Sequence, residues 1–146
     1  MKLILTIIVL ILIISTNSFA QILYGEKRVV FEKEKNVFVG FKSDSNTLRF
    51  TPTENNLDSV DAILQKYFLT MLTKSKMHPN FENYFRQYVG VIIKGEKCIF
   101  INAAFRKTES FLEHTFGPKG GGEGYFGTII NLEKSIVVRF SFNASR

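Results

Sequence analysis

The most constraining feature of this sequence is a pair of strand-like segments, residues 84–93 and 96–105, separated by only two residues. Both segments are rich in β-branched and aromatic side chains, which favour strands. The residues between them are Lys94-Gly95, and glycine supplies the positive φ angle that a two-residue hairpin turn needs. Such a turn fixes the register of the whole hairpin. The expected pairs are Ile93–Glu96, Val91–Cys98, Val89–Phe100, Tyr88–Ile101, Gln87–Asn102 and Arg86–Ala103.

One helix is expected from about residue 56 to residue 74. Apolar side chains recur there in steps of three and four, which is the helical period. The main positions of this stripe are Leu57, Val60, Leu64, Tyr67 and Met71. Thr53 or Asn55 can serve as the N-cap.

A second hairpin is expected at residues 125–132 and 135–142, with Glu133-Lys134 at its turn. Simple alternation predicts one shared face of the last strand for Ile136, Val138, Phe140 and Phe142. Between the hairpins, the glycine-rich residues 117–124 should form a loop, and residues 110–116 could form a short helical turn.

Shorter strands are expected ahead of the helix, at residues 29–31, 37–41 and 47–50, with Pro52 ending the last of them. The sequence as a whole predicts an α+β fold. One main helix packs on a four-stranded antiparallel sheet, accompanied by short N-terminal strands.

The first twenty residues predict a cleaved signal peptide. Lys2 precedes an apolar run of about a dozen residues, which is shorter than the roughly 20 that span a bilayer as a helix. Ser18 and Ala20 are the small residues that signal peptidase accepts before a cut, so the mature chain should begin at Gln21. The alternative is an uncleaved membrane anchor. We expect residues 21–146 to be a single domain that is periplasmic or extracellular, with no permanent anchor.

Charge and cysteine content limit the classes of partner. The full chain carries 19 basic and 13 acidic side chains, a net charge of +6, which becomes +5 once Lys2 leaves with the leader. Charges of both signs are interspersed around residues 26–35, so the sequence does not predict nucleic-acid binding, although an anionic partner stays possible. The lone Cys98 excludes an intramolecular disulfide, and its place in an apolar strand favours burial.

Both faces of the first hairpin carry apolar side chains, and one helix can cover only one of them. A monomer rarely leaves such a second face in water. The N-terminal strands, the 106–124 segment, a second copy of the chain or a ligand could cover it, so a homodimer is one open prediction.

No constellation of residues predicts catalysis, and we expect neither a metal nor a cofactor. The glycine cluster lacks the Gly-Lys-Ser/Thr ending and the following helix of a nucleotide-binding loop. His78 and His114 do not form a zinc-binding spacing with Cys98.

The polar residues within the first hairpin are the best candidates for ligand binding: Arg86, Gln87, Tyr88 and Asn102. A buried polar group must find a partner, because leaving it unpaired costs about 1–3 kcal/mol. In the alternative interpretation, Gln87 and Asn102 pair with each other across the hairpin and Arg86 points to water.

The segment Tyr84-Phe85-Arg86-Gln87-Tyr88-Val89-Gly90, followed by Gly95-Glu96-Lys97 and Ile101-Asn102, resembles a family of small exported hypothetical proteins from Bacteroidetes-type bacteria. Further matching segments are Phe50-Thr51-Pro52-Thr53, Gly121-Gly122-Glu123-Gly124-Tyr125-Phe126 and Ile130-Asn131-Leu132. The resemblance covers residues 50–142 and implies export and a fold, but no activity. The order of one helix and then four antiparallel strands is similar to that of cystatin-like folds, an analogy that implies no function.

The sequence therefore favours an exported, non-catalytic binding module whose partner is an unknown protein or small ligand. One alternative is a small secreted hydrolase that uses Cys98 or Arg86 together with a distant histidine. A weaker alternative, suggested only by the cystatin-like order, is an inhibitor or immunity-type protein.

Overall fold

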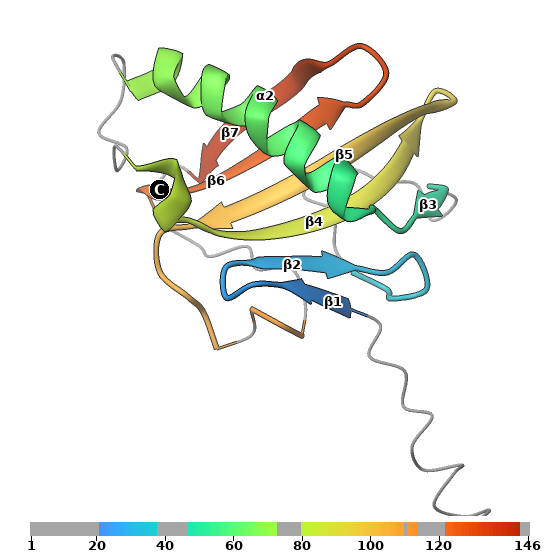
Figure 1. The fold of residues 1–146 in the computed structure, drawn as a ribbon, viewed down its shortest axis with the longest axis horizontal. Helices are drawn as coiled ribbons and strands as arrows, with labels where there is room; N and C mark the ends of the chain where they lie inside the picture. The colour runs from blue at the N-terminus through green and yellow to red at the C-terminus, as the bar shows by residue number, and fades with distance from the viewer. Residues whose placement is uncertain (1–20, 38–46, 73–79, 110, 114–121, 144–146) are drawn as a thin grey trace, which may run out of the picture.

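The computed structural model describes residues 21–37, 47–72, 80–109, 111–113 and 122–143. The predicted leader, residues 1–20, lies outside them. The elements are β1 (Gln21–Tyr24), β2 (Arg28–Phe31), β3 (Arg49–Phe50), α2 (Glu54–Leu72), the 3-10 helix η1 (Phe81–Asn83), β4 (Phe85–Ile93), β5 (Glu96–Ala104), β6 (Gly122–Asn131) and β7 (Ile136–Asn143). The sheet has the order β1-β2-β4-β5-β6-β7, and β3 also pairs with β4. Helix α2 lies across one face of this sheet, so the predicted α+β class is confirmed (Figure 1).

The β4–β5 hairpin forms with the predicted turn and register. Lys94 and Gly95 both have positive φ angles, 51° and 83°, as a two-residue turn that follows the twist of the strands requires. All predicted pairs are present, including Gln87 with Asn102.

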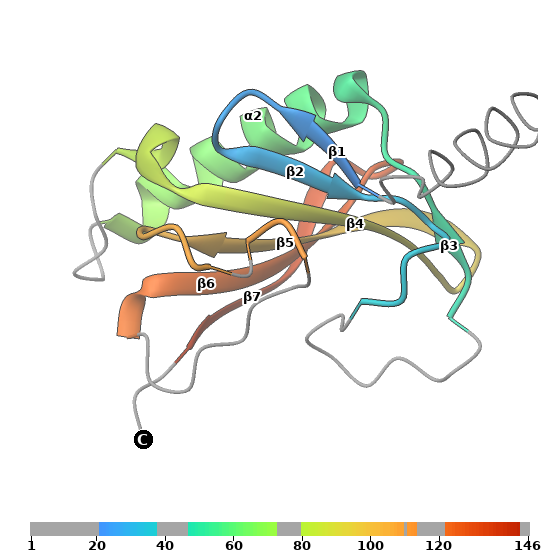
Figure 2. The same ribbon diagram turned by 90° about the horizontal axis from the view of Figure 1, so that it is seen from below.

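The N-terminal strands extend the sheet and make it mixed. Strands β1 and β2 form an antiparallel hairpin, and β2 then pairs in parallel with β4, from Arg28 opposite Arg86 to Phe31 opposite Val89. Figure 2 shows this hairpin beside β4. The predicted four-stranded antiparallel sheet is confirmed as β4 to β7, and the sheet as a whole is mixed because β2 pairs with β4 in parallel. The parallel pair arises because the chain between β2 and β4 includes α2, which is long enough to return the chain to the same end of the sheet.

Helix α2 begins two residues before the predicted start. The Thr53 hydroxyl accepts a hydrogen bond from the Asn56 amide at 3.4 Å, and the Asn56 side-chain oxygen accepts one from the Thr53 amide at 3.1 Å. This reciprocal pair selects Thr53 over Asn55 as the N-cap. The predicted end at residue 74 lies outside the described residues.

The C-terminal hairpin departs from prediction at its turn and on its faces. Four residues, 132–135, separate β6 from β7 in place of two. Ile129 pairs with Arg139 and Ile130 with Val137, so Val138 is an extra residue in a β-bulge. The bulge breaks the alternation: Val137 joins Phe140 and Phe142 against the core beneath α2. The predicted shared face for Ile136 and Val138 with the two phenylalanines was therefore wrong.

Strand β6 begins at Gly122, so the last glycines of the predicted 117–124 loop belong to a strand. Residues 111–113 form a turn within the predicted helical segment, and residues 110 and 114–116 lie outside the described residues.

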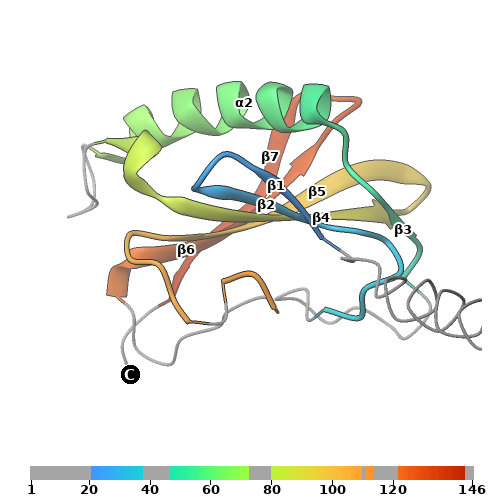
Figure 3. The ribbon, with the colours of Figure 1, turned by 60° about the horizontal axis from the view of Figure 1, so that its bottom comes forward.

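Each face of the sheet carries its own core. Beneath α2, the cluster includes Leu57, Leu64, Phe68, Tyr88 and Phe126. On the opposite face, Val29, Phe31, Val89 and Phe100 pack with Val37 and Phe111. Figure 3 shows α2 on one side of the sheet and the segment after β5 on the other. The chain thus contributes its own cover to the second face, through residues that follow β2 and β5. The strand predicted at 37–41 is described only at Val37.

Gly90 lets two strands share one edge of β4. It pairs with Phe50 of β3, directly beyond the stretch of β4 that pairs with β2. A Cβ at this position would lie 2.2 Å from the Phe50 carbonyl oxygen, a distance that no side chain tolerates.

We expect Gly90→Ala to lower the free energy of unfolding by about 1–3 kcal/mol, because the backbone of β3 must move away. Urea denaturation measures the change. Gly127→Ala is the matched control, since its Cβ would meet Phe100 at an ordinary 3.5 Å and should change stability by less than about 1 kcal/mol. Equal effects of the two substitutions would contradict this interpretation.

Candidate functional site

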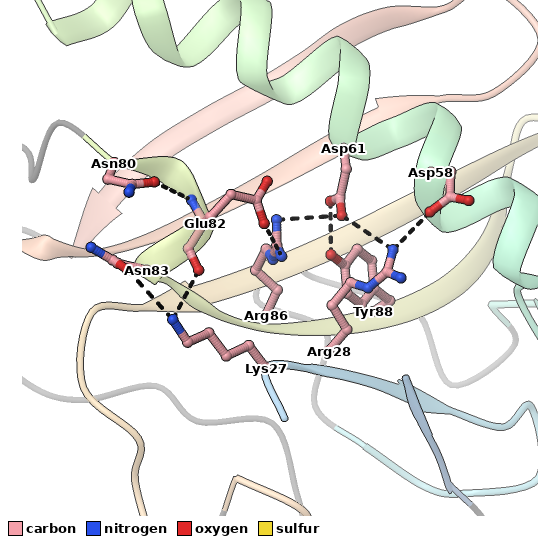
Figure 4. A network of polar contacts seen from close by, with 9 residues as sticks. All are labelled: Lys27, Arg28, Asp58, Asp61, Asn80, Glu82, Asn83, Arg86 and Tyr88. Atoms are coloured by element: carbon pink, nitrogen blue, oxygen red, sulfur yellow. Dashed lines mark hydrogen bonds and ion pairs between the residues drawn. The ribbon is translucent and has the colours of Figure 1, made fainter. Parts of the chain in front are cut away.

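Arg86 and Tyr88 lie beneath α2, where both contact Asp61 (Figure 4). The Tyr88 hydroxyl donates to Asp61 Oδ1 at 2.7 Å, and Arg86 Nη1 lies 3.3 Å from Asp61 Oδ2. Arg86 is only 3% exposed, and its guanidinium also lies over the Phe81 ring at 4.5 Å. The expectation that Arg86 points to water was therefore wrong, because a carboxylate on the covering helix draws it inward.

The cluster continues outward to the surface as a set of alternating charges. Arg28 donates to Asp58 at 2.8 Å and lies 3.7 Å from Asp61, while Arg86 donates to Glu82 at 3.2 Å. Lys27 donates to the Glu82 carbonyl oxygen and to the Asn83 side chain. Two of the three cations, Arg28 and Arg86, pair with the three carboxylates, and Lys27 binds neutral oxygens. The network joins β2, β4, α2 and η1, and its formal charges sum to zero.

Burial dominates the electrostatics of Asp61. Desolvation raises the pKa of its carboxyl, against the opposing effects of Arg86, the Tyr88 hydroxyl and Arg28. The pKa of Tyr88 is raised well above its usual range, first by burial and then by the adjacent Asp61 charge. The phenol therefore stays protonated and acts as a hydrogen-bond donor.

Gln87 and Asn102 lie on the opposite face of the sheet. The Asn102 amide donates to Gln87 Oε1 at 3.2 Å, and Gln87 Nε2 donates to the Phe111 carbonyl oxygen at 2.8 Å. Their predicted pairing across the hairpin is confirmed, and it also holds the segment that covers this face. The four predicted site residues thus form two pairs on opposite faces, and each pair bonds to the chain itself. A ligand-binding role for them stays a prediction.

Cys98 is 2% exposed, and burial raises the pKa of its thiol, which disfavours the reactive thiolate. His78 and His114, the possible partners for catalysis, lie outside the described residues. In the described parts of the chain, no group of three or more His, Cys, Asp or Glu side chains could hold a metal ion.

Strand β7 presents a different kind of site, a long edge of the sheet. It has eight residues, and β6 is its only neighbouring strand in the described sheet. Ile136 and Val138 are 49% and 54% exposed, and Arg139 is exposed beside them. The register places Arg139 opposite Ile129, on the face of the sheet away from α2. The edge therefore combines an available backbone with apolar and cationic side chains.

Sequence reasoning missed Asp61 and its partner Arg28. A signal was present, because Asp61 stands one turn after Leu57 and one turn before Leu64, within the stripe of the helix that faces the sheet. An acid at such a position needs a buried partner.

Comparisons of the chain with protein-family models, with curated proteins and with solved structures found no match. The resemblance to a family of exported proteins stays a prediction. No helix in the described part of the chain is long and apolar enough to cross a membrane.

The raised pKa of Asp61 predicts a specific dependence of stability on pH. Since the folded-state pKa exceeds the ordinary 3.8, the folded chain holds this proton more tightly than the unfolded chain. The resulting stabilisation is complete below pH 3.8 and is lost as the pH rises through the folded-state pKa. We expect the stability of the wild type relative to Asp61→Asn to fall over this window, as measured by urea unfolding at successive pH values. A relative stability that rises with pH would contradict the raised pKa.

The hydrogen bond between Gln87 and Asn102 predicts that substitutions of the two residues have non-additive effects on stability. Gln87→Leu and Asn102→Leu should each lower the free energy of unfolding by about 1–3 kcal/mol, because each removes hydrogen bonds from a buried group. The double variant should lose less stability than the sum of the two single losses, since the hydrogen bond between the two amides is lost only once. Thermal or urea denaturation of the four proteins gives the coupling. Strict additivity would show that the two side chains do not interact.

Proposed function

We propose that residues 21–146 form an exported, non-catalytic interaction domain that binds an extended segment of a partner protein along β7. The observation that carries this proposal is the eight-residue sheet edge with two exposed branched aliphatic side chains. An open edge presents unpaired backbone N–H and C=O groups, which are a template for an added strand. Strand addition is a recurring mode of peptide recognition, in which the backbone supplies affinity and the side chains supply specificity.

The two edges of the sheet differ in a way that favours β7. Strand β1, at the other edge, has only four residues. On the α2 side of β7, Phe140 stacks on Phe126 with centroids 5.1 Å apart and contacts Tyr67 at 5.3 Å. A strand added to β7 would continue both the sheet and this aromatic layer.

The interior residues favour binding over hydrolysis. A nucleophile must reach its substrate, and Cys98 is buried. Arg86 is held by two carboxylates, Asp61 and Glu82. The cystatin-like order and the inhibitor function that it suggested rest on topology alone and have no further support.

The test is a selection of peptides that bind the full chain, as processed by the cell that expresses it. The peptides come from a displayed library of random twelve-residue sequences. Amide hydrogen exchange then locates the selected peptides. We expect slower exchange within residues 136–143, because an added strand protects the backbone of the edge.

Val138→Asp should weaken this binding by about tenfold or more, because it places a desolvated charge beside the added strand. Leu69→Asp is the matched control, since Leu69 is similarly exposed, at 59%, but lies on α2. Peptides that protect another segment, or a library from which no peptide is enriched, would overturn the proposal.

A further inference from the structure

We propose that the segment bound along β7 is acidic: it carries an Asp or Glu opposite Arg139 and apolar residues on either side of that position. This inference rests on the proposed function and names the chemistry of the partner. It follows from the sequence of side chains along one edge.

Arg139 is the charge that an incoming strand meets. Its side chain is exposed, and in the described part of the chain it has no ion-pair partner. Ser141, on the same face, is uncharged, as is Ile136. Opposite charges on directly facing residues stabilise a pair of strands, and like charges destabilise it. An acidic side chain opposite Arg139 is therefore the complementary choice.

The neighbouring positions call for apolar side chains. Successive residues of a strand point to opposite faces, so the residues flanking the acid lie on the α2 side of the sheet. There they meet Phe140, which is partly buried against Phe126, Tyr67 and Phe142. The preferred segment thus has the pattern apolar–acidic–apolar.

A second copy of this chain fits the two registers centred on Arg139 and Phe140 poorly. Two β7 strands related by a twofold axis run antiparallel, so a register centred on Arg139 places this residue opposite itself. A register centred on Phe140 places each Arg139 opposite Ser141, diagonally across from the other arginine. Both registers bring like charges together, whereas the strand of a different protein can place an acid opposite Arg139. In these registers the repulsion acts against self-association, and a strand of complementary charge is favoured as the occupant.

The net charge of the chain also favours an acidic partner over a second copy. The chain is basic, with a net charge of +6 that becomes +5 for residues 21–146, because Lys2 is the one charged residue ahead of them. A net positive field speeds encounters with an acidic partner and slows encounters with a second copy.

The experiment uses three synthetic peptides that alternate valine and threonine and differ only at the central residue, which is glutamate, glutamine or lysine. Fluorescence anisotropy measures their affinity for the full, cell-processed chain. We expect the order glutamate, then glutamine, then lysine, with about fivefold or more between the extremes. Added salt should reduce the difference.

Arg139→Glu should reverse this order and favour the lysine peptide. Arg106→Glu is the matched control, because it changes the net charge equally at an exposed residue just after β5, and it should keep the original order. Reversal by both variants would show a general effect of net charge and would overturn the assignment to Arg139.

The outcomes separate this inference from the proposed function. If hydrogen exchange maps all three peptides to β7 and fluorescence anisotropy gives them equal affinities, the acidic preference is refuted and the edge is retained as the binding site. Peptides that bind elsewhere would refute both. Light scattering that shows a dimer, disrupted by Val138→Asp and kept by Leu69→Asp, would identify a second copy as the occupant and refute the acidic partner.

Discussion

Strand β4 carries the constraint on which the other elements depend, because it pairs with three strands at once. One of its edges pairs along nine residues with β5. The other edge is divided between the parallel β2 and the antiparallel β3, and Gly90 is the residue at which pairing with β3 begins. Since the strand is covered on both faces, each of its side chains has to find a partner within the fold. The N-terminal hairpin and the start of α2 are consequently positioned by a single strand.

The polar residues of β4 make the attachment of the covering layers specific. Arg86 and Tyr88 contact Asp61 on α2, and Gln87 contacts the carbonyl of Phe111 on the other side. Sliding of the helix over the sheet would break these contacts and leave Asp61, Arg86 and Tyr88 buried without their partners. Buried charge pairs of this kind add little net stability, but breaking one costs several kcal/mol.

The parts of the fold that depend on short-range geometry could be predicted from the sequence, and the parts that depend on distant segments could not. A two-residue turn determined every pair of β4 with β5, including Gln87 with Asn102. The partner of Arg86 was missed because Asp61 is 25 residues away and reaches it only after α2 has packed. The faces of β7 were misassigned because one bulged residue, Val138, reverses the alternation. The parallel pairing of β2 with β4 has no local signal, since any edge of the sheet could have received that hairpin. The edge proposed for binding was also not recognised, because strand order decides which strand lies outermost.

Strands β1 and β7 occupy opposite edges of one sheet, and this arrangement governs how the molecule can be handled. A purification handle added after Arg146 would begin only three residues beyond the end of β7 and would compete with whatever lies along that edge. Surface immobilisation through the N-terminal side, next to β1, leaves the far edge facing the solution. The same geometry would allow a fusion partner or dye to be attached ahead of β1 while the opposite edge stays accessible.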